Sequence, residues 1–285
     1  MSTETKKKST AVAVVEEAPA LPLAVLNPNS RAARAFSQNV GEGGVQLSEL
    51  ASVKVPSGTA KVFSFEVGGV DYNETELVGV PVQIIKRGTL WPTEGDSDLG
   101  QHRPLLVCTS DWTQPLMYAT RPGEGTEDEN FGDIDPKSIE AHKVGTLADG
   151  SSVYSWLELD QNKWGTTSKG TKKGKRVDER AEIILFRKDD VQPLRVSVPP
   201  SSVRHLKKMI SGLSAPYFEC VFSITLVTID DGKAPAHPEM VFKIKEVLSE
   251  EVGDVVATTL RVPFTAATRQ ETTHHEEVRM IENKE

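Results

Sequence analysis

Apolar and polar residues alternate in short segments along most of this 285-residue chain, and turn-forming residues separate the segments. Alternation with a period of two is typical of β-strands that bury one face. The pattern predicts seven or eight strands, at residues 61–67, 78–86, 104–108, 152–159, 181–187, 194–198, 217–229 and 240–247.

Glycine and proline refine this prediction at two places. Gly68-Gly69 follows the first strand and is typical of a hairpin turn. Pro81 lies inside the second strand. Because proline donates no backbone hydrogen bond, it places that strand at a sheet edge or at a strand start.

One helix is well marked. Pro199-Pro200 ends the strand at 194–198, and Ser201 or Ser202 is then expected to cap a helix over residues 203–211. Gly212 follows the last helical residue, where glycine commonly ends helices.

Closely spaced strands with few helices favour a mostly β fold of the α+β class, as an antiparallel β-barrel or sandwich. A Ser/Thr/Lys-rich start followed by an Ala/Val/Pro-rich stretch predicts disorder at residues 1–28. A single β-rich domain is expected over residues 29–250, opening with a short helix at 29–40. The remaining residues, 251–285, are expected to form a polar, partly acidic tail.

Charge is concentrated in one region of an otherwise acidic protein. The net charge of the chain is −8, but residues 163–188 hold nine Lys or Arg against three Asp or Glu. A basic loop at 163–180 on an acidic protein favours binding to a polyanion through phosphate contacts. The alternative is a solvated charged loop without a partner.

An acidic loop at residues 121–136 carries six acids and no base after Arg121. It has two interpretations. The loop imitates phosphate and rests on a basic groove until it is displaced, or it is a solvated insertion, which is the commoner case.

Enzyme signatures are missing from the sequence. It contains no phosphate-binding GxxxxGK[ST], no HExxH, no GxSxG and no GxGxxG between a strand and a helix.

Two isolated cysteines, Cys108 and Cys220, make neither a disulfide framework nor a zinc site, and they fit a reducing cytoplasm. The apolar stretch 11–26 is interrupted by Glu16, Glu17 and prolines, which excludes a signal peptide or membrane span. We therefore expect no catalysis, no cofactor and no metal.

Aromatic residues interleave with the cations, as a single-strand binder requires. Bases stack on exposed rings while Lys and Arg follow the phosphate backbone. Arg204, Lys207 and Lys208 form a second basic cluster, and their i, i+3, i+4 spacing places them on one helix face. The alternative for each tryptophan is burial in the core, which is at least as common for large aromatic side chains as an exposed stacking position. The expected nucleic-acid-binding residues are Lys163, Trp164, Lys169, Lys172, Lys173, Lys175, Arg176, Arg204, Lys207, Lys208, Trp91 and Trp112.

Several stretches resemble a family of phage and mobile-element proteins described as single-stranded-DNA-binding proteins. The resemblance extends over about residues 34–250, and Pro-Pro-Ser-Ser followed by a basic helix is its most specific part. The stretches that carry it are AFSQNVGEGGVQLSELASVKVPSG (35–58), PLLVCTSDW (104–112), QNKWG (161–165), GKR (174–176), ILFRKDDVQPLRVSVPPSSVRHLKKMISGL (184–213), YFECVFSITLV (217–227) and VFKIKEVLSEE (241–251).

This chain departs from the family at its cysteines. The resemblance implies a zinc-ribbon-like cluster of four cysteines, of which only Cys108 is present here. Trp156 and Leu159 stand where a CxxC is expected, and Val177 or a neighbour stands where the last cysteine is expected. Since a closed zinc site needs four ligands, we expect a small hydrophobic cluster in place of the metal. Trp156 is then a core residue, and Trp164 is the better candidate for stacking.

The resemblance implies a protein that binds single-stranded DNA without sequence specificity during DNA replication or recombination of a phage or mobile element. It also implies a β-barrel resembling the OB-fold. The protein is expected in the cytoplasm of the host bacterium. The expected partners are single-stranded DNA, phage or host replication proteins, and further copies of the chain in a homo-oligomer, with no membrane. The alternative is a non-enzymatic phage structural or adaptor protein that binds protein partners. A nuclease is a third hypothesis, for which the sequence shows no carboxylate cluster.

Overall fold

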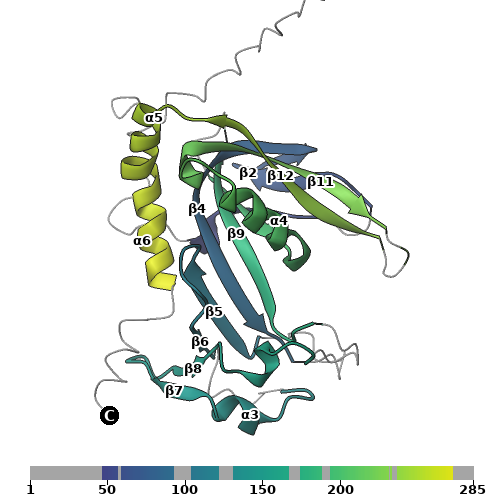
Figure 1. Ribbon diagram of the computed structural model, residues 1–285, viewed down its shortest axis with the longest axis vertical. Helices are drawn as coiled ribbons and strands as arrows, with labels where there is room; N and C mark the ends of the chain where they lie inside the picture. The colour runs from purple at the N-terminus through teal and green to yellow at the C-terminus, as the bar shows by residue number, and fades with distance from the viewer. Residues whose placement is uncertain are drawn as a thin grey trace, which may run out of the picture.

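The computed structural model describes residues 47–56, 59–92, 104–121, 131–166, 174–187, 193–230, 232 and 236–271. These residues form a mostly β structure with few helices, which confirms the predicted fold class at that level (Figure 1). The strands are β1 (Ala51–Val53), β2 (Phe63–Val67), β3 (Val70–Glu74), β4 (Glu76–Leu90), β5 (Leu106–Asp111), β6 (Tyr118–Thr120), β7 (Lys143–Thr146), β8 (Ser152–Ser155), β9 (Asp178–Arg187), β10 (Leu194–Val198), β11 (Cys220–Ile229) and β12 (His237–Val247).

Helices are short except at two places, the segment after β10 and the C-terminal part of the described chain. The α-helices are α3 (Pro136–Glu140), α4 (Pro200–Ser211), α5 (Glu250–Val255) and α6 (Arg261–Glu271), with a π-helical turn, η4 (Val256–Leu260), between the last two. Single 3-10 turns are η1 (Leu47–Glu49), η2 (Asp160–Asn162) and η3 (Tyr217–Glu219). The expected disorder at 1–28 and the expected helix at 29–40 lie outside the described residues.

The main sheet is mixed and has ten strands. Its path runs β1-β10-β9-β4-β5-β6-β8-β7, and β11 joins β4 while β12 joins β11. Among the strand pairs that the structure describes, only β1–β10 is parallel. Strands β2 and β3 form a separate antiparallel hairpin. Within the described residues, strand pairing does not return from one end of this path to the other.

Strand β4 is the longest strand described, and it pairs with three other strands. Its first residues pair with β11 and β9, and its last residues pair with β5 and β9. In Figure 1, β4, β5 and β9 run from an upper part, which holds α4, β11 and β12, to a lower part with β7, β8 and α3. The upper and lower parts therefore share one continuous sheet.

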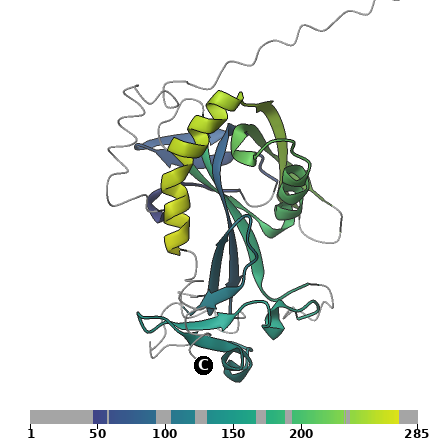
Figure 2. The ribbon, with the colours of Figure 1, turned by 60° about the vertical axis from the view of Figure 1, so that its left-hand side comes forward.

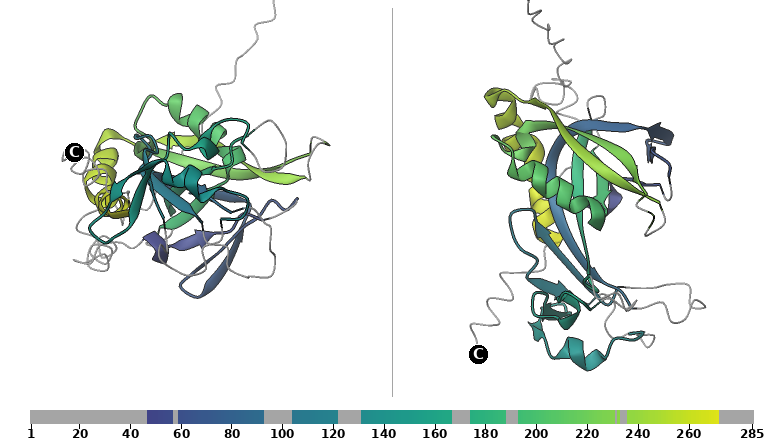
Figure 3. Two further views of the ribbon diagram at one scale, coloured as in Figure 1. Left: turned by 90° about the horizontal axis from the view of Figure 1, so that it is seen from below. Right: turned by 45° about the vertical axis from the view of Figure 1, so that its right-hand side comes forward.

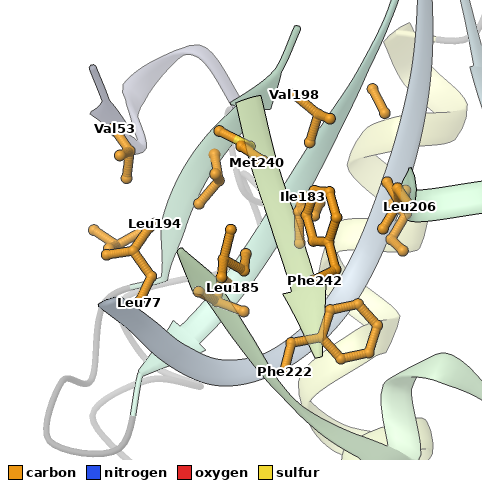
Figure 4. Packing of buried hydrophobic residues seen from close by; sticks show 14 of the residues in the cluster. Val53, Leu77, Ile183, Leu185, Leu194, Val198, Leu206, Phe222, Met240 and Phe242 are labelled. Carbon is orange, nitrogen blue, oxygen red and sulfur yellow. The ribbon is translucent and has the colours of Figure 1, made fainter. Parts of the chain in front are cut away.

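Alternation along the central strands separates two cores. Ile84 and Ile183 point into the main core, which β2, β11, β12 and α4 cover, and Figure 4 shows Leu206 of α4 among the strand side chains. The neighbouring residues Ile85 and Ile184 point into a second core under the C-terminal helices. Figure 2 shows α6 crossing the sheet, and the right-hand view of Figure 3 shows α4 in front of the sheet with α6 behind.

Pro81 corrects the prediction of an edge strand. It lies inside β4, the most central strand, opposite Leu185 of β9, and the register shifts between Pro81 and Gln83. The residue left out of the register is Val82, so Pro81 lies beside a bulge, a position at which sheets tolerate proline.

The C-terminal part of the chain also corrects the prediction, because the expected tail at 251–285 begins with packed helices. Val256, Leu260, Phe264 and Ala267 recur every three or four residues and are buried in the second core. The π-helical turn precedes Pro263. A wider turn there accommodates a proline that breaks a regular α-helix by clashing with the carbonyl four residues earlier.

Helix α4 ends at Ser211, before Gly212, as predicted, but it begins at Pro200 instead of residue 203 and lacks the predicted cap. Its N-cap is Pro199, and no side chain caps the helix. Ser202 is instead fully buried, and its hydroxyl accepts a hydrogen bond from the Met240 amide at 2.9 Å. This contact attaches the helix to β12.

We expect Ser202→Ala to lower the free energy of unfolding by about 1–3 kcal/mol, because it leaves the buried Met240 N–H without an acceptor. Urea unfolding followed by circular dichroism measures the change. Ser201→Ala is the matched control, since Ser201 is more exposed and caps nothing. Equal losses in the two variants would contradict this role for Ser202.

Candidate nucleic-acid interface

The basic loop rises from a closed stem. The Gly165 amide donates to the Gly174 carbonyl at 2.7 Å, and both glycines have positive φ, at 97° and 141°. The Thr166 hydroxyl oxygen also accepts from the Arg176 amide at 3.2 Å. The two ends of the loop are therefore held together. Lys169, Lys172 and Lys173 lie outside the described residues.

Each cation described within 163–188 has a carboxylate partner, which the sequence did not indicate. Arg176 binds both oxygens of Asp133, one of them at 2.8 Å, and its side chain is only 9% exposed. This pair joins the basic loop to the acidic loop. Arg187 lies over the stacked rings of Phe65 and Tyr72. The pairs are Lys163–Asp160, Lys175–Glu179, Arg176–Asp133, Arg180–Asp178 and Arg187–Glu74.

Helix α4 presents its cations differently. Arg204, Lys207 and Lys208 are exposed, as the helical spacing predicted, while Leu206 is buried in the main core. Arg204 binds Glu239 of β12 at 3.1 Å but keeps a side chain that is 75% exposed. Among the residues that the structure describes, Lys207 and Lys208 form no ion pair. Their charge is available to an external anion.

The four tryptophans take different positions. Trp164, after the η2 turn, is 76% exposed, and Trp91, at the end of β4, is 41% exposed. Trp112 is partly buried against the main core, and the Lys86 ammonium lies 5.5 Å from its ring centroid. This placement favours Trp112 as a support for Lys86 over Trp112 as a stacking platform. Trp156 is fully buried, which confirms its assignment to the core.

The structure adds Lys86, which the sequence reasoning missed. Alternation places Lys86 on the same face of β4 as Ile84 in the main core and Gly88, against which Trp156 packs. It therefore lies between the upper and lower cores. Burial and the neighbouring charge of Lys207 lower the pKa of Lys86. The alternation of side chains along β4 could have indicated in advance that Lys86 shares a face with Ile84.

Lys86 interacts electrostatically with both basic segments. The charge of Lys207 on α4 lowers the pKa of Lys86, and the charge of Glu179, which binds Lys175 of the loop stem at 3.4 Å, raises it. We call this set of residues (Arg204, Lys207, Lys208, Lys86 and Lys175) the basic track.

The hydrophobic cluster expected in place of a zinc ribbon is present. Cys108, Trp156, Leu159 and Val177 are all buried in one cluster of the lower part. Burial raises the pKa of the Cys108 thiol far above its ordinary value, which opposes the thiolate that a metal ligand requires. Within the described ranges, no group of three or more His, Cys, Asp or Glu is placed to hold a metal ion.

Comparisons with protein-family models, with curated proteins and with solved structures found no match to this chain. In the part of the chain that the structure describes, no helix is both long enough and apolar enough to cross a membrane.

Proposed function

We propose that this protein binds single-stranded DNA without sequence specificity, during DNA replication or recombination of a phage or mobile element. The observation that carries the proposal is the exposed pair Lys207 and Lys208, which no carboxylate neutralises within the described residues. On an acidic protein, such cations are best explained by contact with phosphates.

The rest of the surface supports the same function. Phosphates of a bound strand contact the basic track, and bases stack on Trp164 and Trp91, the exposed rings in the lower part. No base-specific contact is required, so binding depends on salt and tolerates any sequence. We expect no catalysis, and we place the activity in the host cytoplasm.

We further propose that the upper part is a variant of the OB-fold. Supporting this, strands β10, β9, β4, β11 and β12 surround the main core, and α4 packs against both β12 and β9. Single-strand binders of this class place nucleic acid across a curved sheet.

The test is the affinity for a fluorescent oligo-dT, measured by anisotropy over a series of salt concentrations. We expect Lys207→Ala/Lys208→Ala to weaken binding and to make the slope of log K against log salt shallower by about 1.4. Each phosphate contact on a single strand contributes about 0.7 to this slope, and the variant removes two contacts. A second variant, Lys169→Ala/Lys172→Ala/Lys173→Ala, tests the loop and leaves the Arg176–Asp133 pair intact.

The control is Lys54→Ala/Lys61→Ala, which removes two exposed lysines at β1 and ahead of β2. Wild-type protein that binds no oligonucleotide at low salt would show that the proposed function is wrong. An α4 variant with the slope of the control would show that the interface lies elsewhere.

A structural or adaptor role is the second candidate, and one observation favours it. Carboxylates of the same chain neutralise every described cation of the basic loop. Because its cations already form ion pairs within the chain, the loop is suited to stabilising the lower part of the fold. Absence of oligonucleotide binding together with a ring-shaped assembly on size exclusion would support this role.

A further inference from the structure

A buried carboxylate on β12 holds the first cation of helix α4. One oxygen of Glu239 accepts a hydrogen bond from the Arg204 guanidinium at 3.1 Å and lies 2.8 Å from the Nε2 nitrogen of His205. Since an ionised carboxylate only accepts, the His205 nitrogen donates. A buried carboxylate is costly unless donors and cations surround it. The burial of Glu239 is therefore tied to the position of Arg204.

Arg204 is held along one edge of its guanidinium only. Its Nη2 group donates to Glu239, and its Nε lies 3.2 Å from Nε2 of His205, so this edge faces the protein. In the described structure the Nη1 group of Arg204 forms no hydrogen bond. The Arg204 side chain is 75% exposed, whereas that of Glu239 is 6% exposed. The two N–H donors of Nη1 are therefore available to a ligand from solvent.

We propose that Arg204 binds one phosphate group of a single-stranded DNA backbone through Nη1, and that Glu239 is the residue that positions it. We call this the Arg204 subsite. The proposal rests on the proposed function for the identity of the ligand. It goes beyond that function because it makes DNA binding depend on an acidic residue, which the sequence reasoning did not select.

A phosphate group suits the free edge because its oxygens accept from a guanidinium in a fixed, planar geometry. Glu239 restrains the long arginine side chain before a ligand arrives, so less entropy is lost on binding. A strand bound at Arg204 also meets further cations, because Lys207 and Lys208 follow on the same exposed face of α4.

The first experiment exchanges arginine for lysine and measures the affinity for oligo-dT over a salt series. Arg204→Lys keeps the charge, but a single ammonium that binds Glu239 leaves no separate edge for a phosphate. We expect weaker binding and a slope of log K against log salt that is shallower by about 0.7, the value of one lost contact on a single strand. The control is Lys143→Arg, an exposed position on β7 at the far end of the sheet path, with the wild-type slope. A wild-type slope in Arg204→Lys would overturn the proposal, because charge alone would then suffice.

The second experiment compares two substitutions that remove the same negative charge. Glu239→Gln keeps an acceptor oxygen for Arg204, and Glu239→Leu removes it. The lost charge favours DNA binding equally in both, so the difference between them measures positioning. We expect Glu239→Leu to bind oligo-dT about two- to tenfold more weakly than Glu239→Gln, the cost of ordering one long side chain on binding. Equal affinities would contradict the positioning role. Circular dichroism checks that both variants fold, and Arg204→Lys decides the proposal if Glu239→Leu does not.

Inorganic phosphate, as a third probe, separates failure of the subsite from failure of the proposed function. The Nε–H signal of Arg204, assigned with Arg204→Lys, is followed by NMR during titration with phosphate, and with chloride at equal ionic strength. We expect a saturable shift with phosphate alone. Such a shift without any oligo-dT binding would leave the Arg204 subsite and reject the proposed function. Oligo-dT binding with equal shifts in phosphate and chloride would leave the function and reject the subsite.

Discussion

Replacing Gly79 with alanine is expected to destabilise this protein by about 3 kcal/mol, the upper part of the usual range for an overpacked core. A Cβ at this position would lie 2.2 Å from the backbone oxygen of Phe186. Gly79 pairs with β9 on one side and with β11 on the other, so neither neighbour can move without disturbing the sheet. Urea unfolding followed by circular dichroism measures the loss.

Gly212→Ala is the matched control. A Cβ there meets nothing closer than 3.5 Å, and Gly212 has a negative φ of −95° at the end of α4. We expect a change in the free energy of unfolding within about 1 kcal/mol. If Gly79→Ala unfolds at the same urea concentration as the wild type, the close approach of β4 and β9 is not a constraint.

Trp156→Ala is expected to destabilise the lower part by about 3–5 kcal/mol, the usual cost of removing a large buried aromatic side chain. Trp156 is fully buried, and its ring lies so close to β4 that a Cβ on Gly88 would be 2.4 Å from it. The cavity left behind removes packing from Cys108, Leu159 and Val177 together. Hydrogen exchange then shows loss of protection in β5 and β8 before β11.

Trp164→Ala makes the same chemical change on a side chain that is 76% exposed. We expect it to leave the free energy of unfolding within about 0.5 kcal/mol of wild type, as surface substitutions do. Equal destabilisation by the two tryptophan variants would contradict the assignment of Trp156 to the core and Trp164 to the surface.

The strands with clear alternation were predictable. Residues 194–198 form β10 with the predicted bounds, and 61–67 contains β2. Four strands escaped prediction, β1, β3, β6 and β7, and each has only three to five residues. Of these, β3, with the polar sequence VDYNE, and β7 are also largely exposed. Their backbone hydrogen bonds to β2 and β8 make them strands, and side-chain burial contributes little. A pattern of hydrophobic residues cannot report such strands.

The candidate site was predictable in part. Helical spacing correctly placed Arg204, Lys207 and Lys208 on one exposed face. The basic loop was visible as composition, but the carboxylates that pair with it were not predicted. Three of the pairs are local, such as Lys175–Glu179, whereas Asp133 reaches Arg176 from a distant segment. Pairing over such sequence distances depends on the fold and leaves no local signal.

The sequence by itself determined the mostly β class and the helix after Pro199-Pro200, because both depend on local periodicity and residue type. Only the tertiary structure decided that Pro81 lies in a central strand and that Lys86 lies between the two cores, over the ring of Trp112. Both follow from strand pairing and helix packing. These contacts join residues far apart in the chain, so their electrostatic and packing energies exist only once the fold has formed.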